Sequence, residues 1–320
     1  MASPPSSTVP AAGPRRSAAL PGRRDYALLL LLGAIWGGSF LLIKIAVATV
    51  PPLTVAAGRI VTGALLMGAL LAVRRTRLPA DPAIWARLAL MGTLGTVLPF
   101  ALINWGETHI DSGLAAILMS AVPIFTIFLA HFLRTDERID AGKIAALILG
   151  GAGVLALIGP DALGGLGSDL LGQLAILGAC CCYAINSLTA RQLAGQSAEA
   201  VTAGMLLAAA LAAVPLSLLL DRPWRIDISL GSAGAVVALG LLPTALGYLV
   251  AFRIIASAGA GFASLNNYLV PLFGVFWGTA LLGERPQPQA LIALALIFLG
   301  VAAPRLLPVL RARLARRFSR

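Results

Sequence analysis

Charged residues are scarce in this sequence. They make up 12% of its 320 residues, about half of the share that a soluble domain carries, and the mean hydropathy is +0.91. Acidic residues are the rarer kind, with 13 Asp and Glu against 24 Lys and Arg. A chain of this composition has too little polar surface for a large water-soluble domain, which excludes most soluble enzyme and binding classes.

The sequence also lacks the groups that several kinds of membrane protein require. No acidic residue lies at the centre of an apolar stretch, which argues against obligate proton antiport through a buried glutamate. Glu107 and His109 could titrate near the rim, but an interfacial location explains both equally well. Without a Walker-type phosphate loop or a Ser/His/Asp or Cys/His grouping, we expect no ATP drive, no enzymatic activity and no cofactor.

Cysteine is limited to three consecutive residues, Cys180, Cys181 and Cys182. Neighbouring residues of a helix point about 100° apart, so these three cannot converge on one metal ion. We interpret them as small apolar residues and expect no metal site.

Long apolar stretches, by contrast, fill most of the chain. Ten can be distinguished, each near the roughly 20 residues that cross a hydrocarbon core. They predict an all-α polytopic membrane protein with ten transmembrane helices. The expected spans are 26–49, 53–73, 84–105, 113–133, 142–159, 170–190, 200–220, 231–254, 260–282 and 289–308.

The second five stretches repeat the first five. A shift of 148 positions superposes identical Gly, Thr, Val, Pro and Phe residues of the two halves, among them Thr96 on Thr244 and Pro123 on Pro271. Because each half has an odd number of spans, the halves must enter the membrane in opposite orientations. The predicted organisation is a disordered cytoplasmic tail (1–24), two five-helix repeats (26–159 and 170–308) and a basic cytoplasmic tail (309–320).

The positive charges are distributed unevenly between the two sides of the predicted bundle. Nineteen Lys and Arg lie on the side shared by both termini, and three lie in the opposite loops. Because cytoplasmic loops retain Lys and Arg, both termini should be cytoplasmic in a multi-pass protein of the cell inner membrane. The same distribution explains the net charge of +11 through topology and lipid headgroups, so we expect no nucleic-acid partner.

Four stretches of the sequence carry a specific resemblance: AIWGGSFLLIK (34–44), SAVPIFTIFLAHFLRTDERI (120–139), GLLPTALGYLVAFR (240–253) and LVPLFGVFWGTALLGERPQPQALIALALIFLGV (269–301). The chain resembles the EamA-type branch of the drug/metabolite transporter superfamily over residues 26–304. This resemblance implies two inverted five-helix halves, a central cavity lined by the first four helices of each half, and alternating access, with helices five and ten peripheral. Two departures are that residues 134–137 replace the expected LGE turn and that Tyr183 replaces the more usual Trp.

Polar and aromatic residues at span centres are the candidates for a substrate-binding site, since a polar side chain in the hydrocarbon region must face protein or a cavity. Trp36 and Ser39 lie on one face of the first span, and their repeat mates Tyr183 and Asn186 lie on one face of the sixth. The two pairs could form the floor and ceiling of a cavity for a small organic solute. Interhelical packing, with Ser39 and Asn186 as hydrogen-bonding groups, is the alternative.

A second candidate is Asn267 in the ninth span. Pro271 lacks an N–H group, so the carbonyl of Asn267 loses its helical partner and could bind a ligand. Pro123 has the same effect on the carbonyl of Met119. A kink that serves packing, with Asn266 and Asn267 satisfying each other, is the alternative reading.

A third candidate is the stripe formed by Thr96, Phe100 and Asn104, which Thr244 and Tyr248 repeat in the second half. Such a stripe suits either a helix core or a permeation path, and the sequence does not separate the two. From it we take Phe100 and Tyr248 as candidate substrate-binding residues.

Two cations, Lys44 and Arg59, lie within spans. Both are close enough to the helix end for their side chains to reach the headgroups, which is the favoured interpretation. The rival interpretation is that one of them attracts a substrate carboxylate or phosphate.

Taken together, these features predict a secondary transporter of small metabolites, an exporter of amino acids or related compounds that works by alternating access. A carrier of organic phosphates or nucleotide sugars, or a drug efflux pump, is the alternative. The expected partners are a small-molecule substrate and the lipid bilayer. Whether the protein forms a homodimer is left open by the sequence.

Overall fold

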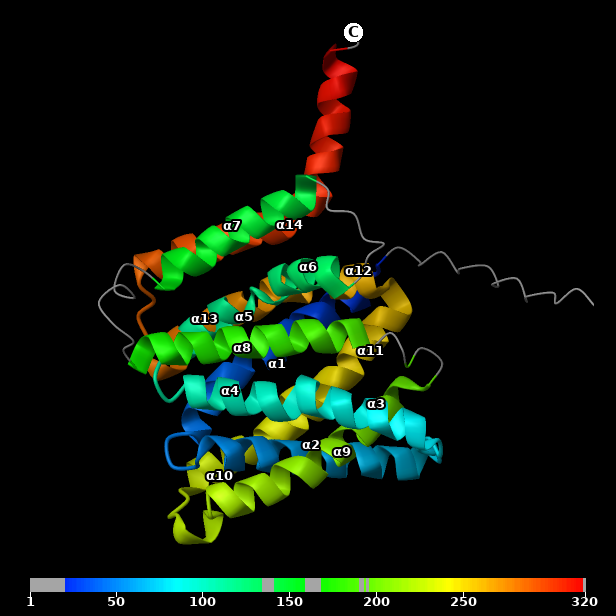
Figure 1. Ribbon diagram of the computed structural model, residues 1–320, viewed down its shortest axis with the longest axis vertical. Helices are drawn as coiled ribbons and strands as arrows, with labels where there is room; N and C mark the ends of the chain where they lie inside the picture. The colour runs from blue at the N-terminus through cyan, green and yellow to red at the C-terminus, as the bar shows by residue number, and fades with distance from the viewer. Residues whose placement is uncertain (1–20, 134–140, 159–167, 190–192, 194–195, 319–320) are drawn as a thin grey trace, which may run out of the picture.

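The computed structural model describes residues 21–133, 141–158, 168–189, 193 and 196–318. All secondary-structure elements within these ranges are helices, and together they form one bundle (Figure 1). The predicted all-α class is therefore confirmed for the described residues. The first 20 residues of the predicted N-terminal tail and the whole 134–137 departure lie outside them.

Among the described residues, the first half of the chain contains eight helical elements, which include one segment of π-helix labelled η1. They are α1 (Arg23–Ala46), α2 (Pro52–Arg74), α3 (Pro82–Gly92), η1 (Thr93–Val97), α4 (Leu98–Gly106), α5 (Ser112–Met119), α6 (Val122–Leu133) and α7 (Ala141–Ile158).

The second half follows the same order with a second π-helical segment, η5. Its elements are α8 (Ser168–Thr189), α9 (Ala198–Leu220), the short 3-10 turn η4 (Pro223–Arg225), α10 (Leu230–Leu239), η5 (Gly240–Leu246), α11 (Gly247–Ala258), α12 (Ala260–Ala263), α13 (Asn266–Leu282) and α14 (Pro288–Phe318). Helix α14 continues through residues 309–318, which the sequence predicted as a separate tail.

Seven helical stretches of the described residues are long and apolar enough to cross a membrane. They are Arg23–Ala46, Pro52–Arg74, Pro82–Gly106, Ser112–Ala130, Asp169–Ser187, Ala198–Arg225 and Leu230–Ala258. Two further apolar helices, Ala141–Ala156 and Pro288–Ala303, are shorter, and α13 has 17 residues. The protein is thus a polytopic membrane protein, while the predicted count of ten spans is not established by helix length alone.

The internal repeat also appears in the irregular segments, because the helices of both halves depart from regular α-helical geometry at related positions. The π-helical segments Thr93–Val97 and Gly240–Leu246 occupy corresponding positions of the two halves. Each half also contains an interrupted helix on the N-terminal side of a proline, at Ser120–Ala121 two residues before Pro123 and at Ser264–Leu265 six residues before Pro271. Single π-helical turns frequently occur at functional sites, and interrupted helices form the binding sites of many transporters.

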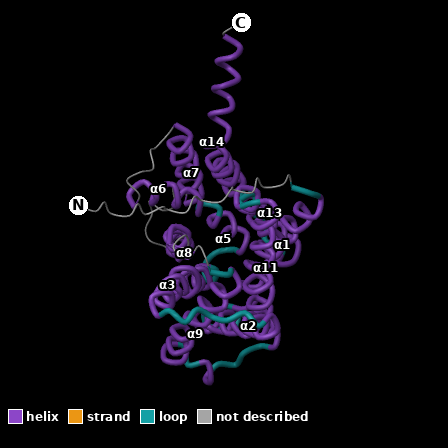
Figure 2. The backbone as a smooth tube through the Cα atoms, turned by 90° about the vertical axis from the view of Figure 1, so that its right-hand side faces the viewer, coloured by secondary structure: helices purple, strands orange, loops and turns teal. Residues whose placement is uncertain are grey.

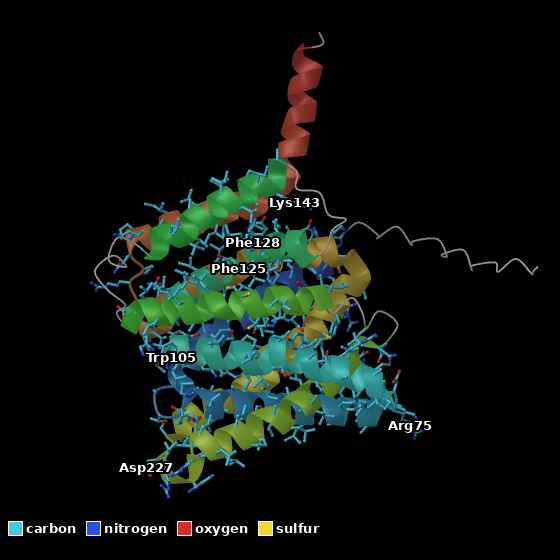
Figure 3. All side chains as sticks on the ribbon, in the orientation of Figure 1. Arg75, Trp105, Phe125, Phe128, Lys143 and Asp227 are labelled. Atoms are coloured by element: carbon cyan, nitrogen blue, oxygen red, sulfur yellow. The ribbon has the colours of Figure 1, made fainter. Side chains whose placement is uncertain are left out.

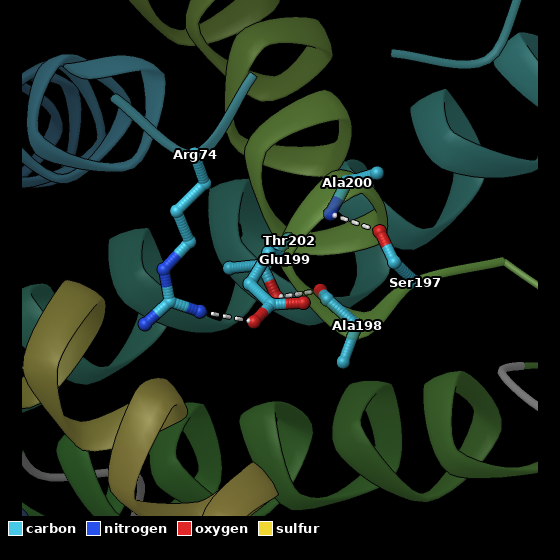
Figure 4. A network of polar contacts seen from close by, with 6 residues as sticks. All are labelled: Arg74, Ser197, Ala198, Glu199, Ala200 and Thr202. Atoms are coloured by element: carbon cyan, nitrogen blue, oxygen red, sulfur yellow. Dashed lines mark hydrogen bonds and ion pairs between the residues drawn. The ribbon is translucent and has the colours of Figure 1, made fainter. Parts of the chain in front are cut away.

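Polar contacts between the halves lie at both ends of the bundle. We call the end where α1 begins the proximal end and the end where α1 finishes the distal end. At the proximal end, the Ser257 hydroxyl donates to the Asp25 carboxylate at 2.6 Å. Figure 4 shows a second proximal contact, the 2.7 Å ion pair between Arg74 of α2 and Glu199 of α9.

The distal contacts cap helix N-termini with carboxylates of the other half. One oxygen of Asp221 accepts from the backbone N–H and the hydroxyl of Thr54, at 2.7 and 2.8 Å. The Glu284 carboxylate accepts from the backbone N–H groups of Ser112 and Gly113, at 2.8 and 2.9 Å. A carboxylate is well placed at these ends because the first N–H groups of a helix have no helical partner and carry partial positive charge.

Small residues allow the central helices to approach closely. A methyl group on Gly37 of α1 would lie 2.5 Å from the Cβ atom of Phe273 in α13, so only glycine fits at this crossing. Helices α7 and α14 pack mainly against each other. Figures 1 and 2 both show this pair together on one side of the bundle, away from α2 and α9, which agrees with the peripheral position that the resemblance implied.

Candidate functional site

A cavity of about 340 Å³ lies between the two halves. Its volume is at the lower end of the range for small-molecule sites. Helices α1, α2, α4, α8, α11 and α13 contribute to it, together with the interrupted segment between α5 and α6. The lining residues are Trp36, Ser39, Phe40, Ile43, Arg59, Phe100, Ile103, Met119, Ser120, Val122, Tyr183, Asn186, Pro243, Tyr248, Asn267, Val270 and Pro271.

All seven residues predicted for substrate binding line this one cavity. Trp36, Ser39 and Phe100 come from the first half of the chain, and Tyr183, Asn186, Tyr248 and Asn267 come from the second. The prediction that these residues contact a substrate stays a prediction, but the geometry that it requires is present.

Trp36 joins the two halves at the cavity wall. Its indole Nε1 donates to the backbone carbonyl of Pro243 at 2.9 Å, and its ring meets that of Tyr248 edge to face with centroids 6.2 Å apart. Pro243 lies within η5, where the π-helical backbone leaves carbonyls available to partners outside the helix. A methyl group on Gly247 would overlap the indole nitrogen, so this position accommodates the ring only as glycine.

Two other predicted residues, Ser39 and Asn186, have polar groups in contact with protein backbone. The Ser39 hydroxyl donates to the carbonyl of Trp36 at 2.6 Å within α1. The Asn186 amide packs against η1, and a methyl group on Gly95 would lie 2.6 Å from its Nδ2 atom. The π-helical segment of each half therefore contacts a residue that lines the cavity.

Each half contains a proline that removes the usual helical donor from a backbone carbonyl. Pro271 lies inside α13 and cannot donate to the carbonyl of Asn267, and Pro123 cannot donate to the carbonyl of Met119. Asn267 and Met119 both line the cavity. One lining residue of each half therefore has a backbone carbonyl without its usual helical donor.

Arg59 is the one cation that the described residues contribute to the cavity lining, and only 7% of its surface is exposed. Its Nε donates to the Thr244 hydroxyl at 2.8 Å, and its guanidinium carbon lies 3.7 Å from the centroid of the Phe100 ring. These contacts fix the side chain across the boundary between the halves. The interpretation that Arg59 reaches the headgroups is therefore wrong, because the protein holds its guanidinium beside the cavity.

The position of Arg59 could have been suspected from its depth. It follows Pro52, the first residue of α2, by seven positions, which is about 10 Å along the helix. Its repeat mate at a shift of 148 is Leu207, so the charge belongs to one half only. A charge that breaks an internal symmetry deep in a span is a functional signal.

The remaining candidates lie outside the cavity lining. Lys44 donates to the backbone carbonyls of Glu107 and Ile110, both at 2.8 Å, at the distal end. Thr96, Asn104 and Asn266 are buried in the helix packing. The stripe on the third span is therefore divided, with Phe100 at the cavity and its two polar neighbours in the core.

Comparison with known proteins identifies the family to which this chain belongs. The profile of the EamA-like transporter family matches residues 24–159 and 170–303. The chain belongs to the EamA-like transporter family. The two matched segments correspond to the two halves that the internal repeat delimits.

Several relatives carry names that indicate transport. A "Probable terminal-alkyne amino-acid exporter" of Streptantibioticus cattleyicolor is 30% identical over 72% of this chain and 75% of its own length. A "Probable amino-acid metabolite efflux pump" of Escherichia coli K12 is 27% identical over 87% of this chain and 94% of its own length. An uncharacterized inner membrane transporter of the same strain, YedA, is 26% identical over 86% of this chain and 89% of its own.

A solved crystal structure is similar to the whole fold. It covers 89% of this chain and 97% of its own with a TM-score of 0.62, at 22% identity. At this identity the similarity shows the shared fold alone. Membership of the EamA-like family, together with the apolar spans, makes this protein a multi-pass membrane protein of a transporter family.

Proposed function

We propose that this EamA-like protein is a secondary transporter that exports amino acids or closely related carboxylates across the inner membrane by alternating access. One observation carries the proposal: a cavity of about 340 Å³ between the halves combines aromatic walls with a single fixed guanidinium, that of Arg59. No carboxylate of the described residues lines it. An anionic group on the solute would compensate the buried positive charge.

An amino acid has complementary groups for each part of this cavity. Its carboxylate would accept charge-assisted hydrogen bonds from the Arg59 guanidinium. Its ammonium group would find acceptors in the carbonyls of Met119 and Asn267, which the two prolines release. Its side chain would pack against Trp36 and Tyr248.

The alternative substrates fit this cavity less well. Phosphate groups are commonly bound by more than one basic residue. Among the described residues, Arg59 is the sole cation in the lining, since Lys44 directs its ammonium to backbone carbonyls. A cationic drug would be repelled by Arg59. The names of the relatives from Streptantibioticus and Escherichia support the same choice.

Counterflow in proteoliposomes with a panel of solutes tests the substrate class. The panel contains amino acids, the amines that lack only the carboxylate, sugar phosphates and a cationic dye. We expect accumulation of labelled amino acids and little of the amines, phosphates or dye. Accumulation of the amines at the same rate as the parent amino acids would remove the proposed role of Arg59.

We further propose that the proximal end faces the cytoplasm, because Lys and Arg are concentrated on that side. Figure 3 labels exposed residues at opposite ends, Arg75 on one side and Asp227 on the other. In intact cells, a membrane-impermeant maleimide should label an Asp227→Cys variant and leave an Arg75→Cys variant unlabelled, in a background without native cysteines. The reverse pattern would place the termini outside.

A further inference from the structure

Glu107 is a fully buried acidic residue that the transport cavity does not use. It caps the C-terminus of α4 at the distal end, directly after the span Pro82–Gly106, and 0% of its surface is exposed. Neither oxygen of its carboxyl group has a hydrogen-bond partner within the described structure. The sequence left open whether this residue titrates or only lies at the interface; the structure places it at the end of the span and encloses its side chain in protein.

The charged groups around Glu107 are engaged elsewhere. Lys44 of α1 donates to the backbone carbonyls of Glu107 and Ile110 and makes no hydrogen bond to the carboxyl group. Glu284, which follows α13, directs its carboxylate to the N-terminus of α5. Arg59 of α2 bonds to Thr244 at the cavity.

The remaining polar neighbours in the sequence and on α8 do not compensate a negative charge either. His109 contacts Thr108 and Trp105 within its own turn, and Asp111 is exposed. On α8, which packs against α4, Gln173 is buried with its amide oxygen unpartnered.

A carboxyl group in this position is favoured in its neutral form. An ionised carboxylate without hydrogen bonds is very unfavourable in a buried site, and the C-terminus of a helix adds partial negative charge. Burial therefore raises the pKa of the Glu107 carboxyl well above its usual range, and the positive charge of nearby Lys44 opposes this shift without cancelling it.

The position of Glu107 relates it to the cavity. Its backbone N–H donates to the carbonyl of Ile103, one turn earlier in α4, and Ile103 lines the cavity. Lys44 likewise follows Ile43, another lining residue. Glu107 thus lies one helical turn beyond the cavity lining, at the end of the bundle where Asp221 and Glu284 join the two halves.

We propose that Glu107 is a proton-binding site that controls the opening of the distal end. With its proton bound, the neutral carboxyl is stable in the buried position that the structure shows. When the distal end opens, water reaches the group, which ionises and releases one proton to the distal compartment. Closure then takes one proton back from the same compartment, so high distal pH holds the distal end open.

This inference goes beyond the proposed substrate class, and its test needs no substrate. Infrared difference spectra of the full-length protein in lipid nanodiscs, titrated with pH, follow the C=O stretch of protonated carboxyl groups. We expect a band that persists at neutral pH in the wild type. It should disappear in Glu107→Gln and remain in the matched control Asp111→Asn, which changes an exposed carboxylate of the same turn.

A second measurement follows the distal end directly. Spin labels on Thr108→Cys and Asp227→Cys, two exposed distal positions of opposite halves, report their separation in a background with the native cysteines replaced by alanine. We expect the long-distance population to increase with pH when Glu107 is present. In the Glu107→Gln background the distribution should match the low-pH wild type at every pH.

Two results would overturn the proposal. One is the absence of a persistent carboxyl band in the wild type at neutral pH, an outcome that does not depend on whether the variant folds. The other is a pH-dependent distance change that survives in Glu107→Gln. Failure of amino-acid counterflow would count against the substrate proposal and leave both measurements interpretable.

Discussion

The indole nitrogen of Trp36 donates to the carbonyl oxygen of Pro243 at 2.9 Å, across the boundary between the two halves. The bond links α1 of the first half to the π-helical segment of the second, beside the cavity. Any rocking of the halves around the cavity must keep this bond or break it. Residues that position Trp36 should therefore affect transport more than stability.

Gly247→Ala tests the position of Trp36 without touching the cavity lining. The added methyl group overlaps the indole nitrogen and displaces the ring. We expect the counterflow rate to fall at least about tenfold, the size of an effect that follows from losing one well-placed hydrogen bond of ~1.4 kcal/mol. Gly234→Ala is the control, because a methyl group there meets no atom within 4 Å. Equal rates in the two variants would show that the Trp36 contact is dispensable.

Pro271→Ala should restore a helical N–H group to α13 and occupy the carbonyl of Asn267. We expect a protein that is at least as thermally stable as the wild type but binds amino acids more weakly. Equilibrium binding and a thermal melt measure the two effects separately. Pro215→Ala, at the one proline inside α9 and outside the cavity lining, is the matched control and should leave binding unchanged. Unaltered affinity in Pro271→Ala would mean that the released carbonyl is not a ligand.

Glu284→Ala removes the carboxylate that caps α5. Two backbone N–H groups, those of Ser112 and Gly113, lose their partner. Loss of an N-terminal cap costs about 0.5–2 kcal/mol of stability, so the melting temperature in detergent should decrease. The exposed neighbour Arg285 serves as control through Arg285→Ala. If Glu284→Ala and Arg285→Ala had the same melting temperature, the capping role of Glu284 would be contradicted.

The stability of the wild type should decrease as pH rises above the ordinary Glu pKa of 4.5. The folded state keeps the Glu107 proton to higher pH than the unfolded state, because burial raises its pKa. Between the unfolded and folded pKa values, stability therefore falls by up to about 1.4 kcal/mol per pH unit from this group. Below both values the group contributes no pH dependence. Melts of the wild type and Glu107→Gln should diverge as pH increases, and parallel curves would argue that Glu107 is ionised in the folded state.

Much of this architecture could be predicted from the sequence because bilayer length and internal repetition act on whole segments. The seven site residues were predicted from the rule that polar groups at span centres face protein or a cavity, and that rule applies to Trp36 and Asn267 whatever their neighbours. Their common location in one cavity required the fold.

The snorkelling interpretation of Arg59 was wrong, and the burial of Glu107 could not be predicted, for the same physical reason. In an isolated helix, the side chain of either residue could extend toward the nearer helix end and water. Packing of the other half decides the matter, since Thr244 holds Arg59 inward and the surrounding helices enclose Glu107. The π-helical segments could not be predicted from the sequence either. A π-helical turn holds one extra residue, which leaves the apolar pattern of the span nearly unchanged.

The role of Arg59 as the carboxylate partner is the central claim, and one comparison tests it most directly. Equilibrium binding of an amino acid and of the amine that lacks its carboxylate is measured for the wild type, Arg59→Gln, and a control, Arg253→Gln, at an exposed arginine of α11. We predict that Arg59→Gln weakens binding of the amino acid by on the order of 10- to 100-fold and leaves the amine unchanged, while the control changes neither. An amino acid that binds Arg59→Gln as tightly as the wild type would contradict the account.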